Sequence, residues 1–471
     1  MKCWKHVTSA SRHSGASRSE QRLHSAHVSF DSDKLNRVLR GLPAARCYWV
    51  GFSGGLDSTV LLHALAQQQS LSARLQALHV NHHLNPQADV WQRHCQQICA
   101  ALHVPLECRG VTVEPAKGQS LEAVAREQRY QVFRALIQEA DMLLLAHHQD
   151  DQMETFLLQA LRGAGQRGLA AMPMIASFEA GHLARPLLGF ARDELQAWAE
   201  MQKLTWLDDP SNADSRFDRN YLRLEVLPVI RQRWPSAAAT VARSARHCGE
   251  ALELLAAVAE EDWGHCTEDQ GRVLPVAALR KLGTARAKNL LRHWLEKLQL
   301  PLPPTHKLEQ IIKEVLPARA DRNPCVSWEG AEVRRYRGRL YGLFPLPVVP
   351  GGELRLTQGE QTALGAGMGT LRLVSAMEGG LRAAGCPAEG LRVCFRSGGE
   401  VCKPAGQAHH RPLKKWLQEF KVVPWMRERL PLLYIGDQLA GVGGLFVCAP
   451  FAAGTGEPGL RIEWLSHPAL H

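Results

Sequence analysis

Two features are missing from this 471-residue sequence: cysteine pairs in C-x-x-C spacing and apolar runs long enough to cross a membrane. Without such pairs, a zinc ribbon or an iron–sulfur cluster is disfavoured. The closest cysteines, Cys95 and Cys99, have instead the spacing of one helix face. We expect the 12 cysteines to be reduced and mostly buried, in a cytoplasmic protein with no membrane partner.

Residues 1–30 lack an apolar core segment, which disfavours a secretory signal. Their Ser-, His- and Arg-rich composition predicts a disordered N-terminal extension rather than an organellar presequence. The whole chain, with 45% hydrophobic and 22% charged residues, has ordinary globular composition and the length of two or three domains. Its net charge of +10 favours a polyanionic partner such as nucleic acid, although many basic enzymes bind none.

In residues 31–232, short apolar runs alternate with helical patterns. The expected strands are residues 47–52, 75–80, 106–111 and 142–146, and the expected helices are residues 58–69, 88–102, 120–140 and 152–162. This alternation predicts a doubly wound parallel sheet of the α/β class. In such sheets ligands bind at the carboxyl ends of the strands, so we expect the active site there.

The character of the chain changes near Trp234. We expect residues 235–345 to form a helical middle domain, with helices at 237–259 and 277–298 and a basic hairpin at 333–344. The Gly- and Pro-rich residues 346–388 are expected to be a linker region. Residues 389–468 are expected to form a small α+β C-terminal domain around one basic helix at 413–420.

The sharpest motif is Ser53-Gly54-Gly55-Leu56-Asp57-Ser58, which follows the first strand and opens a helix. Glycines let the backbone approach a ligand closely, and N–H groups at a helix N-terminus form a cradle for an anion. The serines add hydroxyl donors, whereas Asp57 would repel phosphate unless a cation such as Mg²⁺ lay between them. A Walker loop is excluded, since that motif ends in Gly-Lys-Ser/Thr. The simpler alternative is an ordinary strand–turn–helix connection.

Charged side chains are expected near the same sheet edge. Asp151 and Glu154 are three residues apart on the helix after the fourth strand, so the pair is suited to hold an ammonium group, assist a metal or accept a proton. Asp150 and Asp151 also suit a plain acidic helix start. Arg126 and Arg129 share a helix face and suit pyrophosphate or a carboxylate, unless Arg126 merely pairs with the acidic residue one turn before it.

Four histidines follow the second and fourth predicted strands: His82, His83, His147 and His148. A zinc site is one interpretation of them. We favour the alternative that these imidazoles are hydrogen-bonding groups near phosphate.

Together, these strings resemble the tRNA(Ile)-lysidine synthases, a family within the PP-loop ATP pyrophosphatases with an adenine nucleotide alpha hydrolase-like fold. The matching strings are S-G-G-L-D-S at 53–58, H-V-N-H-H-L at 79–84, S-L-E-A-V-A-R-E-Q-R-Y at 120–130, H-H-Q-D-D-Q-M-E-T-F at 147–156, W-L-D-D-P-S-N at 206–212, D-R-N-Y-L-R at 218–223 and R-P-L-K-K-W-L-Q-E at 411–419. The resemblance spans nearly the whole chain after Asp31. It departs at His410, where the family usually has Gly before the arginine.

The resemblance implies a ligase that forms a carbon–nitrogen bond using ATP and Mg²⁺. ATP would adenylate the C2 oxygen of the wobble cytidine of tRNA(Ile) with a CAU anticodon. Free L-lysine would then displace AMP to form lysidine, which changes the codon read from AUG to AUA and the identity from methionine to isoleucine.

The family's site residues carry over onto matching positions of this sequence. The residues expected to bind ATP are Ser53, Gly54, Gly55, Leu56, Asp57, Ser58, His79 and Asn81, with Asp57 also on the metal. Asp57, Arg126, Asp151 and Glu154 are expected to be catalytic, and the substrate is expected to contact Arg126, Arg129, Asp150, Asp151, Glu154 and Arg223. Which carboxylate holds the lysine ammonium and which accepts its proton stays open.

The C-terminal strings imply a tRNA-binding domain in which Lys414, Lys415 and Arg427 contact RNA, and the middle domain is expected to bind tRNA as well. Trp416 and Trp425 lie among these basic residues and suit stacking on bases, but core positions are favoured for both. The oligomeric state, a homodimer included, stays open.

Two other functions stay open at this point. Another PP-loop tRNA-modifying enzyme, such as a thiolase, would be expected to carry catalytic cysteines or C-x-x-C pairs, which are absent. A non-catalytic RNA-binding protein would not need the complete string from Ser53 to Ser58 together with Asp151 and Glu154.

Overall fold

The computed structural model describes residues 30–116, 120–319, 322–468 and 470. The extension predicted for residues 1–30 therefore lies outside the described residues, except for Phe30. The described residues form two compact units, which divide between Leu254 and Leu255. Helix α11 (Ala237–Cys266) continues across this boundary, which therefore differs from the boundary predicted at residues 232–235.

The first unit is built on a six-stranded sheet with the order β3-β2-β1-β4-β6-β5. Its strands are β1 (Tyr48–Gly51), β2 (Leu75–Asn81), β3 (Leu106–Gly110), β4 (Met142–Leu144), β5 (Ile175–Phe178) and β6 (Gly181–Ala184). All pairs are parallel except β5 with β6. The predicted α/β doubly wound sheet is confirmed. The β5–β6 hairpin was not predicted, since its four-residue strands contain no continuous apolar run.

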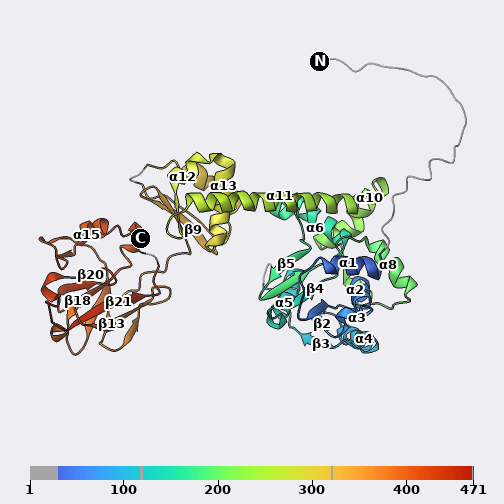
Figure 1. The fold of residues 1–471 in the computed structure, drawn as a ribbon, viewed down its shortest axis with the longest axis horizontal. Coiled ribbons are helices and arrows are strands. Elements are labelled where there is room, and N and C mark those ends of the chain that lie inside the picture. Colours follow the sequence, from blue (N-terminus) through green and yellow to red (C-terminus); the bar gives the residue numbers. More distant parts are fainter. Residues whose placement is uncertain (1–29, 117–119, 320–321, 469, 471) are drawn as a thin grey trace, which may run out of the picture. The chain divides into compact units, whose positions relative to one another are not determined.

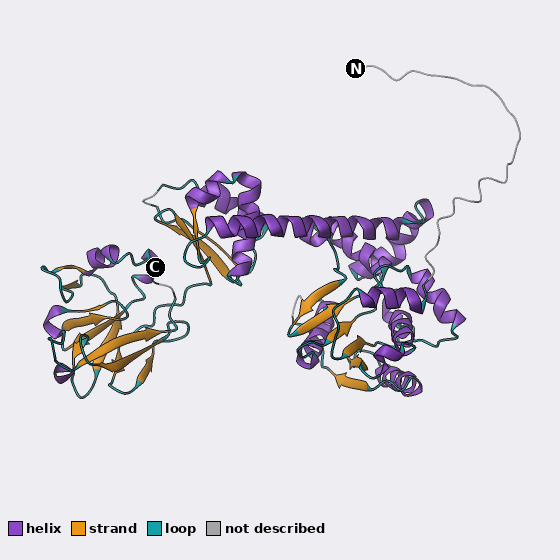
Figure 2. Cartoon of the chain, in the orientation of Figure 1, coloured by secondary structure: helices purple, strands orange, loops and turns teal. Residues whose placement is uncertain are grey.

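Helices cover both faces of this sheet (Figures 1 and 2). They are α1 (Ser32–Arg40), α2 (Leu56–Ala66), α3 (Gln69–Ser72), α4 (Ala88–Ala101), α5 (Leu121–Leu136), α6 (Gln149–Leu161), α7 (Gln166–Leu169) and α8 (Arg192–Met201). Neighbouring residues of β4 belong to different apolar clusters: Leu144 lies on the α2 side, and Leu143 lies with Phe133 of α5. Because both faces of the sheet are covered, the central strands β1 and β4 are largely apolar, which is why they could be found in the sequence.

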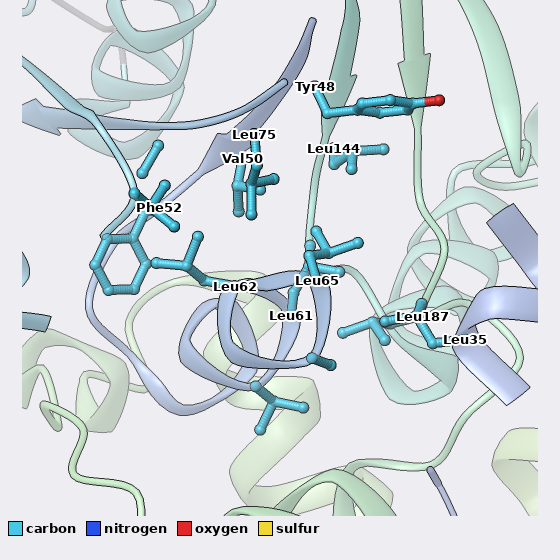
Figure 3. Packing of buried hydrophobic residues seen from close by; sticks show 14 of the residues in the cluster. Leu35, Tyr48, Val50, Phe52, Leu61, Leu62, Leu65, Leu75, Leu144 and Leu187 are labelled. Carbon is cyan, nitrogen blue, oxygen red and sulfur yellow. The ribbon is translucent and has the colours of Figure 1, made fainter. Parts of the chain in front are cut away.

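Helix α2 is the centre of the larger cluster. Its sequence is apolar on nearly all sides, and Leu61, Leu62 and Leu65 are fully buried. Figure 3 shows these side chains facing Val50 of β1 and Leu144 of β4. The packing fixes the N-terminus of α2 directly after the end of β1.

The strand order reverses between β1 and β4. From β1 the chain adds β2 and then β3 on one side, and it then crosses to β4 on the other side of β1. The loops that leave the carboxyl ends of β1 and β4 therefore diverge, which opens the crevice in which α/β sheets bind ligands. The loop after β1 contains the Gly-rich motif, and the loop after β4 contains His147 and His148.

The end of the first unit is helical. It comprises η1 (Pro210–Ala213), α9 (Asp218–Tyr221), the π-helix η2 (Leu222–Val226), α10 (Leu227–Arg233) and the first part of α11. Met153 of α6 packs with Leu227, Ala237 and Ala238 in a small cluster. This cluster holds the α9–α11 segment against α6.

The second unit begins with helices on a four-stranded antiparallel sheet of order β7-β10-β9-β8. The elements are β7 (Val273–Pro275), α12 (Val276–Lys281), α13 (Gly283–Lys297), α14 (Thr305–Gln310), the π-helix η3 (Ile311–Val315), β8 (Cys325–Trp328), β9 (Ala331–Tyr336) and β10 (Arg339–Leu343). The predicted hairpin is confirmed as β9–β10, and β7 and β8 extend it into a sheet. The helix predicted at 277–298 is two helices, separated at Leu282, and the second begins at Gly283, where φ is +73°.

The C-terminal part consists mainly of two antiparallel sheets, of order β11-β15-β18-β19-β20 and β12-β13-β21-β14. Its strands are β11 (Leu354–Leu356), β12 (Gln361–Ala363), β13 (Thr370–Ala376), β14 (Leu381–Arg382), β15 (Leu391–Phe395), β16 (Val401–Cys402), β17 (Arg411–Pro412), β18 (Pro431–Ile435), β19 (Gln438–Val442), β20 (Phe446–Val447) and β21 (Gly459–Leu465). The helices are η4 (Ala383–Gly385), α15 (Leu413–Glu419), η5 (Pro424–Met426) and η6 (Ala449–Phe451).

Residues 346–388, which we expected to be a linker, contribute four of these strands. β13 pairs with β21 over its whole length, and Leu356, Leu371 and Leu381 are fully buried in the core of this part. The expectation failed because β11, β12 and β14 are only two or three residues long and glycines separate the strands, so composition alone suggested a loop.

The 11 cysteines in the described part of the chain are all free thiols, as expected. Only Cys95, Cys99, Cys402 and Cys448 are buried, so the expectation that most would be buried is wrong.

Among the described residues, no helix is both long and apolar enough to cross a membrane.

Candidate active site

The Gly-rich loop forms the predicted turn between β1 and α2. Gly54 has φ of +81°, and a Cβ at this position would lie 2.9 Å from Cys95 Sγ, so glycine is required here. The hydroxyls of Ser53 and Ser58 lie 3.1 Å apart, and Gly55 N–H donates to Ser53 Oγ at 3.4 Å. The N-terminal N–H groups of the 11-residue α2 point into this turn. The result is a polar cradle of the kind that binds phosphate.

Two of the predicted ATP ligands, His79 and Asn81, form hydrogen bonds within the protein next to the Gly-rich loop. His79 is buried, and its Nδ1 lies 2.9 Å from the carbonyl oxygen of Phe52. Asn81 is also buried; its amide donates to Asp89 and Gln92, and its oxygen accepts from the N–H of His83. Both side chains therefore fix the ends of β1 and β2.

Asp57, in the first turn of α2, lies opposite the start of α6. Its Oδ2 is 3.5 Å from His148 Nε2, and the same nitrogen is 3.4 Å from Asp151 Oδ2. Burial alone would lower the pKa of His148, but Asp151 and Asp57 outweigh this effect and raise it. Asp57 Oδ1 is buried without a hydrogen-bond partner among the described residues. One carboxylate oxygen thus remains available beside the phosphate cradle.

Helix α6 starts close to where it was predicted, and Asp151 and Glu154 share a face. His148 is its N-cap: its Nδ1 accepts from Asp150 N–H at 3.2 Å, and its own N–H donates to Asp151 Oδ2 at 3.1 Å. Imidazole thus takes the place of the usual Ser or Asp cap. His148 was considered from sequence only as a zinc ligand or phosphate contact, and its position between Asp57 and Asp151 was missed.

The carboxylates of α6 are paired with arginines of the α9–α10 segment. Arg219 Nε donates to Glu154 Oε2 at 2.7 Å, and Arg223 Nε donates to Glu154 Oε1 at 2.7 Å. Both guanidinium groups also reach Asp151 Oδ1, at 3.1 and 3.4 Å. Burial alone would raise the pKa of Asp151, but His148, His147 and Arg219 outweigh this and lower it to about 2.

Of these arginines, only Arg223 was predicted as a site residue. Arg219 and Arg231 were missed; Arg231 donates to Asp150 Oδ1. The spacing of Arg219 and Arg223, one turn apart in D-R-N-Y-L-R, was a signal for a shared helix face. What they contact, however, is 65 or more residues earlier in the chain.

This pairing bears on the predicted role of the two carboxylates. Both oxygens of Glu154 are engaged, and its side chain is only 1% exposed. Asp151 is engaged through one oxygen by the arginines and through the other by His148. In this arrangement neither carboxylate has an oxygen without a partner, so an incoming ammonium would have to replace a guanidinium.

Helix α5 contributes further positive charge. Arg126 lies over the ring of Tyr130, with its guanidinium carbon 5.0 Å from the ring centre. The described residues show no ion pair between Arg126 and Glu122, the local alternative considered from sequence. Burial, together with the positive charge of Arg126, lowers the pKa of Arg129.

His147 lies among this group. Burial lowers the pKa of His147 to about 3, and Arg185, Arg219 and Arg126 reinforce the shift although Asp151 opposes it. A neutral imidazole surrounded by arginines leaves a net positive region, suited to pyrophosphate or to the carboxylate of an amino acid. The zinc interpretation gains no support, since no group of three or more His, Cys, Asp or Glu in the described ranges is arranged to hold a metal.

The predicted RNA contacts of the C-terminal domain divide into two kinds. Lys414 and Lys415 are exposed on α15. Arg427 is instead engaged within the second unit, where Nε donates to Val422 O and Nη2 donates to the hydroxyl of Tyr336, both at 2.9 Å. Trp416 and Trp425 are 1% and 7% exposed, so the core interpretation is confirmed for both.

Three family models match the chain: the PP-loop domain over residues 28–230, the TilS substrate binding domain over 274–341 and the TilS substrate C-terminal domain over 391–464. The chain is also 41% identical to the tRNA(Ile)-lysidine synthase of Coxiella burnetii over 436 residues, which cover 92% of this chain and 96% of that protein. The chain belongs to the tRNA(Ile)-lysidine synthase family.

Two further tRNA(Ile)-lysidine synthases show the same extent of similarity. The protein of Alkalilimnicola ehrlichii is 42% identical over 92% of this chain and 97% of its own length. That of Yersinia pseudotuberculosis is 40% identical over 91% of this chain and 98% of its own length. Similarity to the tRNA(Ile)-lysidine synthase family thus extends through both units rather than through the ATP-binding part alone.

Proposed function

We propose that this protein ligates L-lysine to C2 of the wobble cytidine of tRNA(Ile) with a CAU anticodon, in the cytoplasm. Family membership over nearly the whole chain supports this function, and one observation in the site supports it most directly. Asp57 lies in the first turn of α2, directly after the phosphate cradle, and its Oδ1 has no hydrogen-bond partner among the described residues, as a ligand of a phosphate-bound metal requires.

The residues present fit Mg²⁺ together with ATP. Mg²⁺ is usually held by one or two carboxylates plus substrate phosphates and water, so a single free oxygen on Asp57 suffices. When bound, Mg²⁺ would neutralise charge that develops on the phosphates. Ser53, Ser58 and the N–H groups from Gly55 onward hold phosphate oxygens, while Leu56 anchors the turn in the core.

The first step transfers AMP to the RNA. The C2 oxygen of cytidine attacks the α-phosphorus of ATP, and the bond to the β-phosphate oxygen breaks to release pyrophosphate. This turns a poor leaving group into a phosphate ester. Arg126 and Arg129, with the neutral His147 beside them, stabilise the negative charge of the departing pyrophosphate.

In the second step the ε-amine of lysine attacks C2, and the C2–O bond breaks to release AMP. The amine has a reference pKa of about 10.4, so only about one molecule in a few thousand is neutral near pH 7. We propose that the ammonium replaces the guanidinium of Arg219 at Asp151 and Glu154, an exchange of one positive charge for another. One of the two carboxylates then takes a proton from the bound ammonium, and the neutral amine that results attacks C2 as the C2–O bond breaks and AMP leaves with the bonding electron pair.

The proposal also assigns tRNA binding to the second unit and the target base to the CAU anticodon. Lys414 and Lys415 lie exposed on α15, as phosphate contacts require. An anticodon loop is single-stranded, so extruding the target base costs little. The product pairs with A instead of G, which converts an AUG reader with methionine identity into an AUA reader with isoleucine identity.

The test is to incubate the protein with ATP, Mg²⁺, labelled lysine and an unmodified tRNA transcript that carries CAU. We expect label in the tRNA and equimolar AMP and pyrophosphate. The matched control is the same transcript with a UAU anticodon, which lacks cytidine at the wobble position. Asp57→Asn should lower the rate about 100-fold or more, while affinity for tRNA stays within twofold. Absence of label with the CAU transcript contradicts the proposal.

A further inference from the structure

Two aromatic side chains project from the α9–α11 segment into solvent. Tyr221 is 52% exposed, and Trp234, the residue after α10, is 63% exposed. By contrast, Trp198, Trp294, Trp416, Trp425 and Trp464 are buried.

The chain around Trp234 is strongly basic. From Leu227 to Gly249 it contains four arginines and no Asp or Glu. Arg233, Arg243, Arg246 and His247 are exposed, and the last three share one face of α11 because they lie three or four residues apart. Arg246 is 3.6 Å from Glu250, whereas Arg233 and Arg243 have no ion-pair partner among the described residues.

This surface adjoins the candidate active site. Arg231, three residues before Trp234, donates to Asp150 in the first turn of α6. Ala237 and Ala238, three and four residues after Trp234, pack with Met153 of α6. Trp234 is therefore held between two contacts to the helix that carries Asp151 and Glu154. Figure 1 shows α10 and the first part of α11 beside α6.

We propose that Trp234 and the exposed arginines of α10 and α11 form a binding surface for the substrate RNA beside the reacting base. An unpaired base stacks on the indole of Trp234, and Arg243 and Arg246 contact successive phosphates. RNA fits because aromatic platforms flanked by arginines bind single strands through stacking and charge together. RNA is favoured over a protein partner because the substrate of the proposed reaction is itself a polyanion and no acidic residue interrupts these arginines from Leu227 to Gly249. This inference rests on the proposed function in one respect only, namely that the bound RNA is the substrate tRNA.

The test measures both RNA affinity and lysine transfer with the full-length protein and a tRNA transcript that carries CAU. Base stacking contributes about 1–3 kcal/mol, so Trp234→Ala should weaken binding about 5- to 150-fold. Trp234→Phe should restore most of the affinity. Arg243→Glu with Arg246→Glu should also reduce the slope of log affinity against log salt concentration by about one to two.

The control is Arg37→Glu with Arg40→Glu, which makes the same double charge reversal on two exposed residues three positions apart at the end of α1. That helix leads into the amino end of β1, opposite the ligand-binding edge, so affinity and salt slope should stay unchanged. Melting temperatures establish that the variants fold; if Trp234→Ala is unstable, the arginine variant and Trp234→Phe still decide the question.

The two proposals can fail separately. If the wild type transfers lysine but the Trp234 and arginine variants keep its affinity and salt slope, the binding surface is wrong and the proposed function stands. If the wild type transfers no lysine but the variants lose RNA affinity, the RNA-binding surface is supported and the proposed function is contradicted. A change in sedimentation without a change in RNA binding would make Trp234 a contact between copies of the chain and would overturn the inference.

Discussion

Arg219 Nε donates a 2.7 Å hydrogen bond to Glu154 Oε2, so a residue of α9 closes over a carboxylate of α6 that is only 1% exposed. Arg223 engages the other oxygen at the same distance. The carboxylate and the guanidinium groups neutralise each other. Without this pairing, burying the charge of either helix would carry a large desolvation cost. The pairing also determines how the site opens, since a cationic substrate must compete with an arginine for the same oxygens.

Glu154→Gln should destabilise the first unit by about 3–5 kcal/mol, because it leaves two guanidinium groups facing each other without the carboxylate that pairs them. The measurement is the urea midpoint of the transition that reports on the first unit. Glu122→Gln, an exposed carboxylate on α5, is the control and should change stability by less than about 0.5 kcal/mol. Equal effects of the two substitutions would contradict the buried pairing.

Gly54→Ala should destabilise the protein by at least about 1–2 kcal/mol, because φ of +81° is unfavourable for alanine and the new Cβ would lie 2.9 Å from Cys95 Sγ. Gly55→Ala is the matched control. There φ is −75°, and the nearest atom to the new Cβ is Ser53 Oγ at 3.5 Å, an ordinary contact. Thermal unfolding of both variants checks this, and a stability loss at Gly55 as large as that at Gly54 would show that the loop conformation differs.

The lowered pKa of Asp151 predicts an acid-sensitive contribution to stability. With a pKa of about 2 in the folded state and 3.8 as the reference, the ionised carboxylate contributes about 2 kcal/mol above pH 5. That contribution falls as pH drops below the reference value and vanishes as pH passes through the folded pKa. The stability difference between wild type and Asp151→Asn should therefore shrink as pH falls from 5 to 3. A difference that does not shrink in that range would contradict the ionised state.

Arg427→Ala should destabilise the second unit by about 1–3 kcal/mol, because its guanidinium joins Val422 to Tyr336. Lys414→Ala with Lys415→Ala should leave stability unchanged and lower the salt slope of tRNA binding by about one to two. Thermal unfolding and binding at several salt concentrations separate the two effects. A stable Arg427→Ala variant with weakened tRNA binding would return Arg427 to the RNA-contacting role predicted from sequence.

The elements that sequence predicted well are those whose local pattern is strong. The strands beginning at Tyr48 and Leu75 and helix α6 were found within a few residues, because a parallel sheet buried on both faces requires apolar strands. Residues 346–388 and the β5–β6 hairpin were not found. Most of their strands are only two to four residues long, and even the seven-residue β13 owes its place to a partner distant in the chain, β21.

The sequence by itself determined the phosphate loop, since the glycines and serines of 53–58 act through backbone conformation and contacts a few residues apart. It also determined which helix face carries Asp151 and Glu154, because helical period sets that geometry. Only the tertiary structure decided which charges those carboxylates meet, that His148 lies between Asp57 and Asp151, and that Trp234 stays in solvent while Trp416 does not. These outcomes depend on packing between segments tens of residues apart, and no periodicity within one segment encodes the partner that another segment supplies.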